Sequence, residues 1–110
     1  MNAKGRREGA SYKPLYHWQP TWPGEKGLHG KPRQDFVGID REEFIGRIRL
    51  EIGGPMNGKW QWSGQGPHLR DRILPHQGYC DTAREASRMV EEYYHRLMRR
   101  NGLRGSKDVG

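Results

Sequence analysis

The stretch Gly58-Lys59-Trp60-Gln61-Trp62, together with Thr82-Ala83-Arg84-Glu85 further along the chain, decides the fold of this protein. The first stretch alternates polar residues with two tryptophans, which is typical of a strand whose tryptophans share one face. The second begins a long amphipathic run with a capping residue, which is typical of the start of a helix. We therefore expect a β-hairpin followed by one helix, with the core between them.

Residues 44–52 predict the first strand of the hairpin. Apolar side chains occupy most even positions of this segment, and charged side chains occupy the odd positions from residue 47 onward. This alternation is typical of a half-buried strand. The glycine-rich segment 53–58 favours a turn or bulge, and the second strand should run from Lys59 to Ser63. The apolar side chains expected on the buried side of the first strand are Phe44, Ile48, Leu50 and Ile52.

The helix has clear signals at both ends. Thr82 is the expected N-cap, with Glu85 at the third helical position, and Asn101-Gly102 should end the helix. Its apolar stripe should pack on the hairpin face that carries Trp60 and Trp62, so we assign both tryptophans to the core. The residues of this stripe are Ala83, Ala86, Met89, Val90, Tyr93, Leu97 and Met98.

These elements predict an α+β fold in which a small antiparallel sheet of two or three strands packs on one C-terminal helix. A short third strand is expected at Gly78 to Cys80. Residues 1–35 contain four prolines and no sustained period, so we expect a long irregular N-terminal arm that is basic and aromatic. Residues 36–101 would form the sheet-and-helix module, and residues 102–110 a basic flexible tail. With only 32% hydrophobic residues, the core must be small.

The net charge of +7 is unevenly distributed. Residues 1–35 contain seven basic and three acidic side chains, residues 99–110 contain four and one, and the segment between them contains nine of each. Excess positive charge indicates nucleic acid or another acidic partner, and charge on flexible tails gives a salt-sensitive, non-specific attraction. The flanking side chains expected to contact a nucleic-acid backbone are Arg6, Arg7, Arg99, Arg100 and Arg104.

The arm is rich in aromatic residues, and two explanations are open. The rings could lie over the small core and enlarge it, because large aromatic side chains bury much apolar area. Alternatively, they could dock into a larger protein, with the prolines limiting the entropy lost on binding. The residues expected to carry such docking are Tyr16, Trp18 and Trp22.

Catalytic and metal chemistry have few candidates. The single cysteine, Cys80, cannot anchor a multi-cysteine zinc site, and its spacing from His76 suits a helix that Pro75 and Gly78 disfavour. A small core also offers little concavity. We therefore expect no enzymatic activity, no cofactor and no metal, and we interpret the five histidines as surface groups. The histidines are His17, His29, His68, His76 and His95.

No apolar run approaches the roughly 18 residues of a membrane span, and no apolar stretch follows the first residues as it would in a secretory signal. We therefore expect no membrane association and a cytoplasmic location. The oligomeric state stays open.

The hairpin face opposite the tryptophans is the candidate binding surface. Arg47 and Arg49 on the first strand should project together with Lys59 and Gln61 on the second, because alternate residues share a face. Such a face suits the major groove, where arginine reads guanine and glutamine reads adenine. An ordinary solvated sheet face is the alternative, and Glu51 weakens its positive field.

A hairpin containing Gly58-Lys59-Trp60, a short third strand and a helix begun by Asp81-Thr82-x-x-Glu85-Ala86 resembles two groups of DNA-binding domains. These are the three-stranded-sheet-plus-helix domains at the N-termini of tyrosine recombinases and in AP2-type transcription factors. The resemblance covers residues 45–101, about half of the chain. It implies a sheet that lies in the major groove and contacts bases with its outward side chains.

We therefore expect a small non-enzymatic nucleic-acid-binding accessory protein that uses the outward sheet face and the basic tails. The alternative is a protein-docking inhibitor from a phage or mobile element, directed at a larger target such as a CRISPR complex or another nucleic-acid-handling effector. Short length and an aromatic arm suit this alternative.

Overall fold

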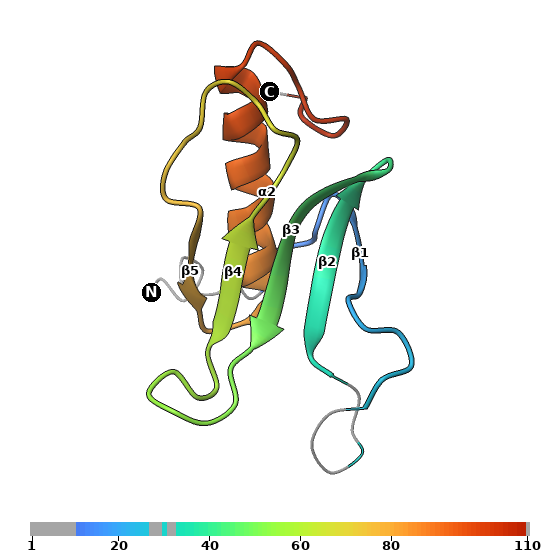
Figure 1. Ribbon diagram of the computed structural model, residues 1–110, viewed down its shortest axis with the longest axis vertical. Coiled ribbons are helices and arrows are strands. Elements are labelled where there is room, and N and C mark those ends of the chain that lie inside the picture. The colour runs from blue at the N-terminus through green and yellow to red at the C-terminus, as the bar shows by residue number, and fades with distance from the viewer. Residues whose placement is uncertain (1–10, 27–29, 31–32, 110) are drawn as a thin grey trace.

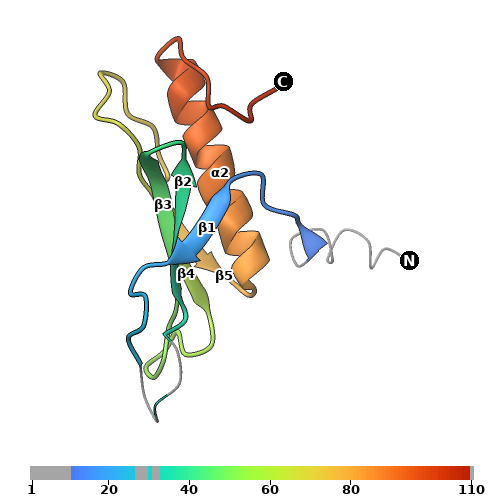
Figure 2. The same ribbon diagram turned by 90° about the vertical axis from the view of Figure 1, so that its right-hand side faces the viewer.

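The computed structural model describes residues 11–26, residue 30 and residues 33–109 of the chain. Five antiparallel strands pair in chain order to form one sheet, and helix α2 packs along one face of it (Figures 1 and 2). The elements are β1 (His17–Pro20), β2 (Asp35–Asp40), β3 (Glu43–Leu50), β4 (Trp60–Gly64), β5 (Gln77–Cys80) and α2 (Ala83–Arg100).

The expected sheet of two or three strands was therefore wrong, because the sheet has five. The additional strands are β1, which comes from the segment expected to be an irregular arm, and β2, which begins at its end. Its prolines do not prevent this pairing. Pro20 is the last residue of β1, and β1 is an edge strand, where a missing backbone N–H costs little.

The helix was predicted correctly at both ends. Thr82 is the N-cap, and its hydroxyl accepts a hydrogen bond from the backbone N–H of Glu85 at 3.1 Å. After the last helical residue, Gly102 has a φ of 75°, the left-handed conformation that favours glycine. The backbone N–H of Leu103 then donates to the carbonyl of Met98 at 2.8 Å, a bond that closes the C-terminal end of the helix.

Strand β3 departs from strict alternation at one residue. Ile39 pairs with Phe44, whereas the preceding residue of β2 pairs with Gly46, so Ile45 is an extra residue in β3. This bulge places Ile45 in the core and leaves Phe44 53% exposed. The expectation that Phe44 lies on the buried side was therefore wrong. Ile52 was also expected there, but it lies beyond the end of β3 and is 64% exposed.

A row of three glycines lies beneath the helix. Gly38 of β2 pairs with Gly46 of β3, which in turn pairs with Gly64 of β4. A Cβ atom added to Gly46 would lie 2.3 Å from Cγ1 of Val90, and one added to Gly64 would lie 2.3 Å from Cδ1 of Tyr93. Both distances are far below van der Waals contact. Only glycine at these positions allows the helical side chains to reach the sheet backbone.

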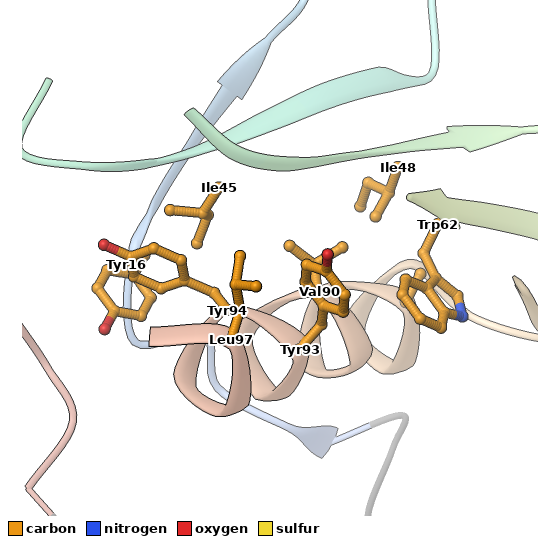
Figure 3. Packing of buried hydrophobic residues seen from close by; sticks show 9 residues of the cluster. Tyr16, Ile45, Ile48, Trp62, Val90, Tyr93, Tyr94 and Leu97 are labelled. Atoms are coloured by element: carbon orange, nitrogen blue, oxygen red, sulfur yellow. The ribbon is translucent and has the colours of Figure 1, made fainter. Parts of the chain in front are cut away.

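Large side chains between the sheet and the helix form the core (Figure 3). Trp62 is 2% exposed, as expected for a core residue, and Trp60 is half-buried with its ring stacked on Phe36 at a centroid distance of 6.4 Å. The buried hydrophobic residues are Tyr16, Ile45, Ile48, Trp62, Ala86, Val90, Tyr93, Tyr94 and Leu97.

A buried carboxyl group joins the N-terminal segment to the helix. Glu91 in the middle of α2 is 1% exposed, and its two oxygens accept hydrogen bonds from four donors. The backbone N–H groups of Leu15 and Tyr16 donate at 3.0 and 3.1 Å, the indole N–H of Trp18 donates at 3.0 Å, and the Tyr12 hydroxyl also donates. Four donors match the acceptor capacity of a carboxylate. This contact holds the segment before β1 against the helix.

A second buried acid holds the C-terminal segment. Asp40, the last residue of β2, is 5% exposed and accepts hydrogen bonds from the Tyr94 hydroxyl at 2.7 Å and from the backbone N–H of Ser106 at 2.9 Å. The Ser106 hydroxyl donates to the other oxygen. Burial alone would raise the pKa of Asp40, but these hydrogen bonds outweigh burial and hold the pKa below its ordinary value.

The glycine row gives a first prediction. Gly64→Ala places a methyl group against the Tyr93 ring, which is 7% exposed, so overpacking should lower the free energy of unfolding by about 1–3 kcal/mol. Urea unfolding measures this cost. Ser63→Ala, next to it in β4 and directed to the opposite face, is the control and should change the free energy by less than about 1 kcal/mol. Equal costs for the two variants would disprove the packing role of Gly64.

The carboxyl group of Glu91 gives a second prediction. Glu91→Gln replaces an acceptor oxygen with an NH₂ group that faces other donors, so it should lower the free energy of unfolding by about 1–3 kcal/mol. The neighbouring Glu92 is exposed and forms an ion pair with Arg88 on the helix surface, so Glu92→Gln should cost less than about 0.5 kcal/mol. The two variants remove the same charge. Urea unfolding at neutral pH would therefore distinguish the effect of losing the buried hydrogen bonds from the effect of losing a negative charge.

The lowered pKa of Asp40 gives a third prediction. A carboxyl group whose pKa is lowered by folding stabilises the fold above its unfolded pKa of about 3.9, and this stabilisation is lost as the pH falls through the folded-state value. The free energy of unfolding should therefore decrease below about pH 4. Asp40→Asn should have a shallower dependence, measured by urea titrations at a series of pH values. A slope unchanged from that of the parent protein would contradict this role.

Candidate nucleic-acid interface

Among the described residues, no helix or strand covers the sheet face opposite α2 (Figure 2). The strand register places two rows of side chains across this outward face. Within the rows, Arg47 and Arg49 lie on β3 and Gln61 lies on β4, so three of the four predicted sheet contacts share one surface. The first row is Gln19, Val37, Arg47, Ser63 and Gln77, and the second is Asp35, Arg49, Gln61 and Tyr79.

Arg47 is held in a fixed orientation by Asp35. Its Nε and Nη2 groups donate to the two carboxylate oxygens at 2.8 and 2.5 Å. Burial would raise the pKa of Asp35, but hydrogen bonds from Arg47, Thr21 and Trp22 hold the pKa below its ordinary value. The guanidinium group also lies 6.0 Å from the centre of the Trp22 ring, and Arg33 lies 5.8 Å from the same ring. Two arginines and one indole thus gather at this edge of the outward face.

Arg49 is more open. Its Nε group donates to Oε1 of Gln61 at 3.0 Å and lies 3.2 Å from a carboxylate oxygen of Glu51, while 47% of the side chain is exposed. Lys59 lies just before β4 and forms a 2.5 Å ion pair with Asp81, in which both side chains are largely exposed. Exposed ion pairs contribute little free energy, so a phosphate group could replace Asp81 at little cost.

The predicted flank arginines that the structure describes lie away from this face. Arg99 pairs with Asp108 through two hydrogen bonds, and Arg104 donates to the backbone carbonyl of Asp108 at 3.4 Å. Arg100 lies 3.9 Å from Asp71 at the end of the helix. Arg6 and Arg7 lie outside the described residues. The C-terminal arginines therefore form a separate basic region at the C-terminal end of α2.

The three aromatic residues predicted for protein docking have different environments. Tyr16 is 7% exposed in the core, and its hydroxyl lies 2.7 Å from Nε2 of His95. Trp18 is half-buried, and its indole N–H donates to Glu91. Trp22 is 40% exposed and donates to Asp35 at 3.3 Å. Only Trp22 presents much surface to a partner.

Two exposed aromatic side chains on the outward face were missed by the sequence reasoning. Tyr79 of β5 pairs with Gln61 and is 47% exposed. Phe44 of β3 pairs with Ile39, which lies on the outward face of β2, and is 53% exposed. Alternation along β5 could have indicated Tyr79, since Cys80 faces the core. Phe44 could not have been found by alternation, because the bulge at Ile45 reverses its side.

Groups that could support catalysis or metal binding are sparse. Among the described residues, no cluster of three or more histidine, cysteine or acidic side chains has the geometry of a metal site, and His29 lies outside them. Cys80 is half-buried, and burial raises its pKa to about 11. A hollow of about 590 Å³ lies between the loop after β4 and helix α2, and its polar lining includes His68, Arg72 and His76.

In the described part of the chain, no helix is both long enough and apolar enough to cross a membrane.

Comparison of the chain with protein-family models, with curated proteins and with solved structures gave no match. The resemblance to the DNA-binding domains of tyrosine recombinases and AP2-type factors therefore stays a prediction.

Proposed function

We propose that this protein is a non-enzymatic nucleic-acid-binding accessory protein that binds through the outward face of its sheet. The observation that carries the proposal is the placement of Arg47, Arg49 and Gln61 on adjacent strands of a face that no described helix or strand covers. Guanidinium groups bind phosphate oxygens and base edges, and an amide side chain adds a donor and an acceptor.

The ion pairs on this face support binding at modest affinity. Asp35 orients Arg47 and uses two of its N–H groups, so other N–H groups of this guanidinium stay available to a ligand. Arg49 shares one N–H group between Gln61 and Glu51 and keeps nearly half of its surface exposed. The acids also reduce the positive field, so contacts on this face should add to the attraction exerted by basic residues elsewhere.

The inhibitor alternative now depends on one exposed side chain. Of its three predicted anchors, Tyr16 and Trp18 are engaged in contacts within the molecule, and Trp22 is the one with a large exposed surface. A docking function would therefore require Trp22 together with other surface residues.

Fluorescence anisotropy with labelled single-stranded and duplex oligonucleotides tests the proposal. Binding should weaken steeply between about 50 and about 200 mM salt, because each phosphate contact adds roughly 0.7–0.9 to the logarithmic slope. Arg49→Gln should weaken binding several-fold and reduce this slope by about one contact. If neither the single-stranded nor the duplex oligonucleotide binds at low salt, the proposal is refuted.

Arg70→Gln is a matched control. Arg70 is exposed in the loop after β4, next to Asp71, whose backbone bonds to Asn101 at the end of α2. The substitution removes the same charge from a position away from the outward face. Affinity and salt slope should stay within about twofold of those of the parent protein. An equal loss for Arg49→Gln and Arg70→Gln would show that only total charge matters.

A further inference from the structure

We infer that the outward face binds single-stranded rather than duplex nucleic acid, with bases stacking on the rings of Phe44 and Tyr79. This inference rests on the proposed function and specifies its ligand. It is carried by exposed aromatic side chains that lie on the same face as the arginines.

Both rings have exposed surface that the fold does not use. Phe44 is 53% exposed and Tyr79 is 47% exposed, and neither lies against another ring or a cation among the residues that the structure describes. The exposed surface of each ring is open to a ligand, and both rings lie on the face that carries Arg47 and Arg49. A base has a flat π-face, and stacking on such rings is tolerant of sequence.

Duplex DNA or RNA cannot use these rings, because its bases are stacked on one another and present only their edges in the grooves. Some polar groups of the face are also already used in hydrogen bonds to one another, which reduces what is left to read base edges. The Oε1 atom of Gln61 already accepts from Arg49, and both oxygens of Asp35 accept from Arg47. The donors best able to read a duplex are thus partly occupied, whereas the rings are free.

The width of the face points the same way. The row from Asp35 on β2 to Tyr79 on β5 crosses three strand spacings, which is about 14 Å. The major groove of B-DNA is about 12 Å wide, so this row could not lie across it and would fit only along the groove. A single strand has no groove to fit and can lie across the sheet, with its backbone beside Arg47 and Arg49 and its unstacked bases on the rings.

At the edge of the face, Trp22 extends this surface. Its ring is 40% exposed and lies near the guanidinium groups of Arg33 and Arg47. Guanidinium planes also stack on bases, so this cluster offers a third position for a nucleotide. Alternating rings and cations are typical of surfaces that follow a single strand.

The test is fluorescence anisotropy at one low salt concentration with three probes: a labelled DNA strand of mixed sequence, the same strand annealed to its complement, and an RNA strand of the same sequence. We expect at least one single strand to bind more tightly than the duplex. Phe44→Ala and Tyr79→Ala should each weaken single-strand binding about 5- to 150-fold and leave weak duplex binding unchanged. The DNA and RNA arms identify which single strand is preferred.

Tyr79→Phe and Leu74→Ala are the controls. Tyr79→Phe keeps the ring and should bind within about threefold of the parent protein. Leu74 is 76% exposed beside the hollow on the helix side, so Leu74→Ala removes exposed apolar surface away from the outward face and should have no effect. Circular dichroism checks that each variant folds.

The outcomes separate this inference from the proposed function. Duplex binding equal to or tighter than single-strand binding, or single-strand affinity unchanged in both alanine variants, would overturn the stacking inference and leave nucleic-acid binding intact. Absence of binding to all three probes would overturn both.

Discussion

The approach of helix α2 to the sheet depends on the row formed by Gly38, Gly46 and Gly64, and the rest of the core is arranged around it. Because these residues have no side chains, Val90 and Tyr93 reach the sheet backbone and fill the space above it. Large side chains, including those of Trp18 and Trp62, then fill the positions beside the row. The small core is thus densely packed, because large side chains from the helix and from neighbouring sheet positions fill the space above the glycines.

The carboxyl group of Glu91 holds the segment that supplies β1, one of the two strands that were not expected. A carboxyl group buried in an apolar core is costly unless donors satisfy its oxygens. All four donors come from residues 12–18, so this segment must cross the helix before it joins the edge of the sheet as β1. Asp40 acts similarly at the end of β2, where it holds residue 106 against Tyr94. Two buried acids therefore attach both ends of the described chain to the core.

Signals within short stretches of sequence predicted the central part of this fold. The parts that depend on contacts between residues far apart in the sequence were missed. Thr82 and the Asn101-Gly102 pair specify the helix ends through neighbouring atoms, and alternation correctly places Arg47, Arg49 and Gln61 on one face. Strand β1 depends on Glu91, which is 73 positions away from Trp18 and looks in the sequence like its exposed neighbour Glu92. The bulge at Ile45 depends on how β2 pairs with β3, which no short stretch of sequence reveals.

Net charge alone does not indicate that the outward face is a binding surface. Asp35 and Glu51 lie beside the arginines, so this face gains little net positive charge and instead gains fixed guanidinium orientations. Arg99 and Arg100 lie away from this face, at the C-terminal end of α2. There they can attract a polyanion without contacting its bases. In the proposed complex, long-range attraction and close contact are therefore properties of different surfaces. Salt should weaken the first more than the second, because stacking on a ring does not release counterions.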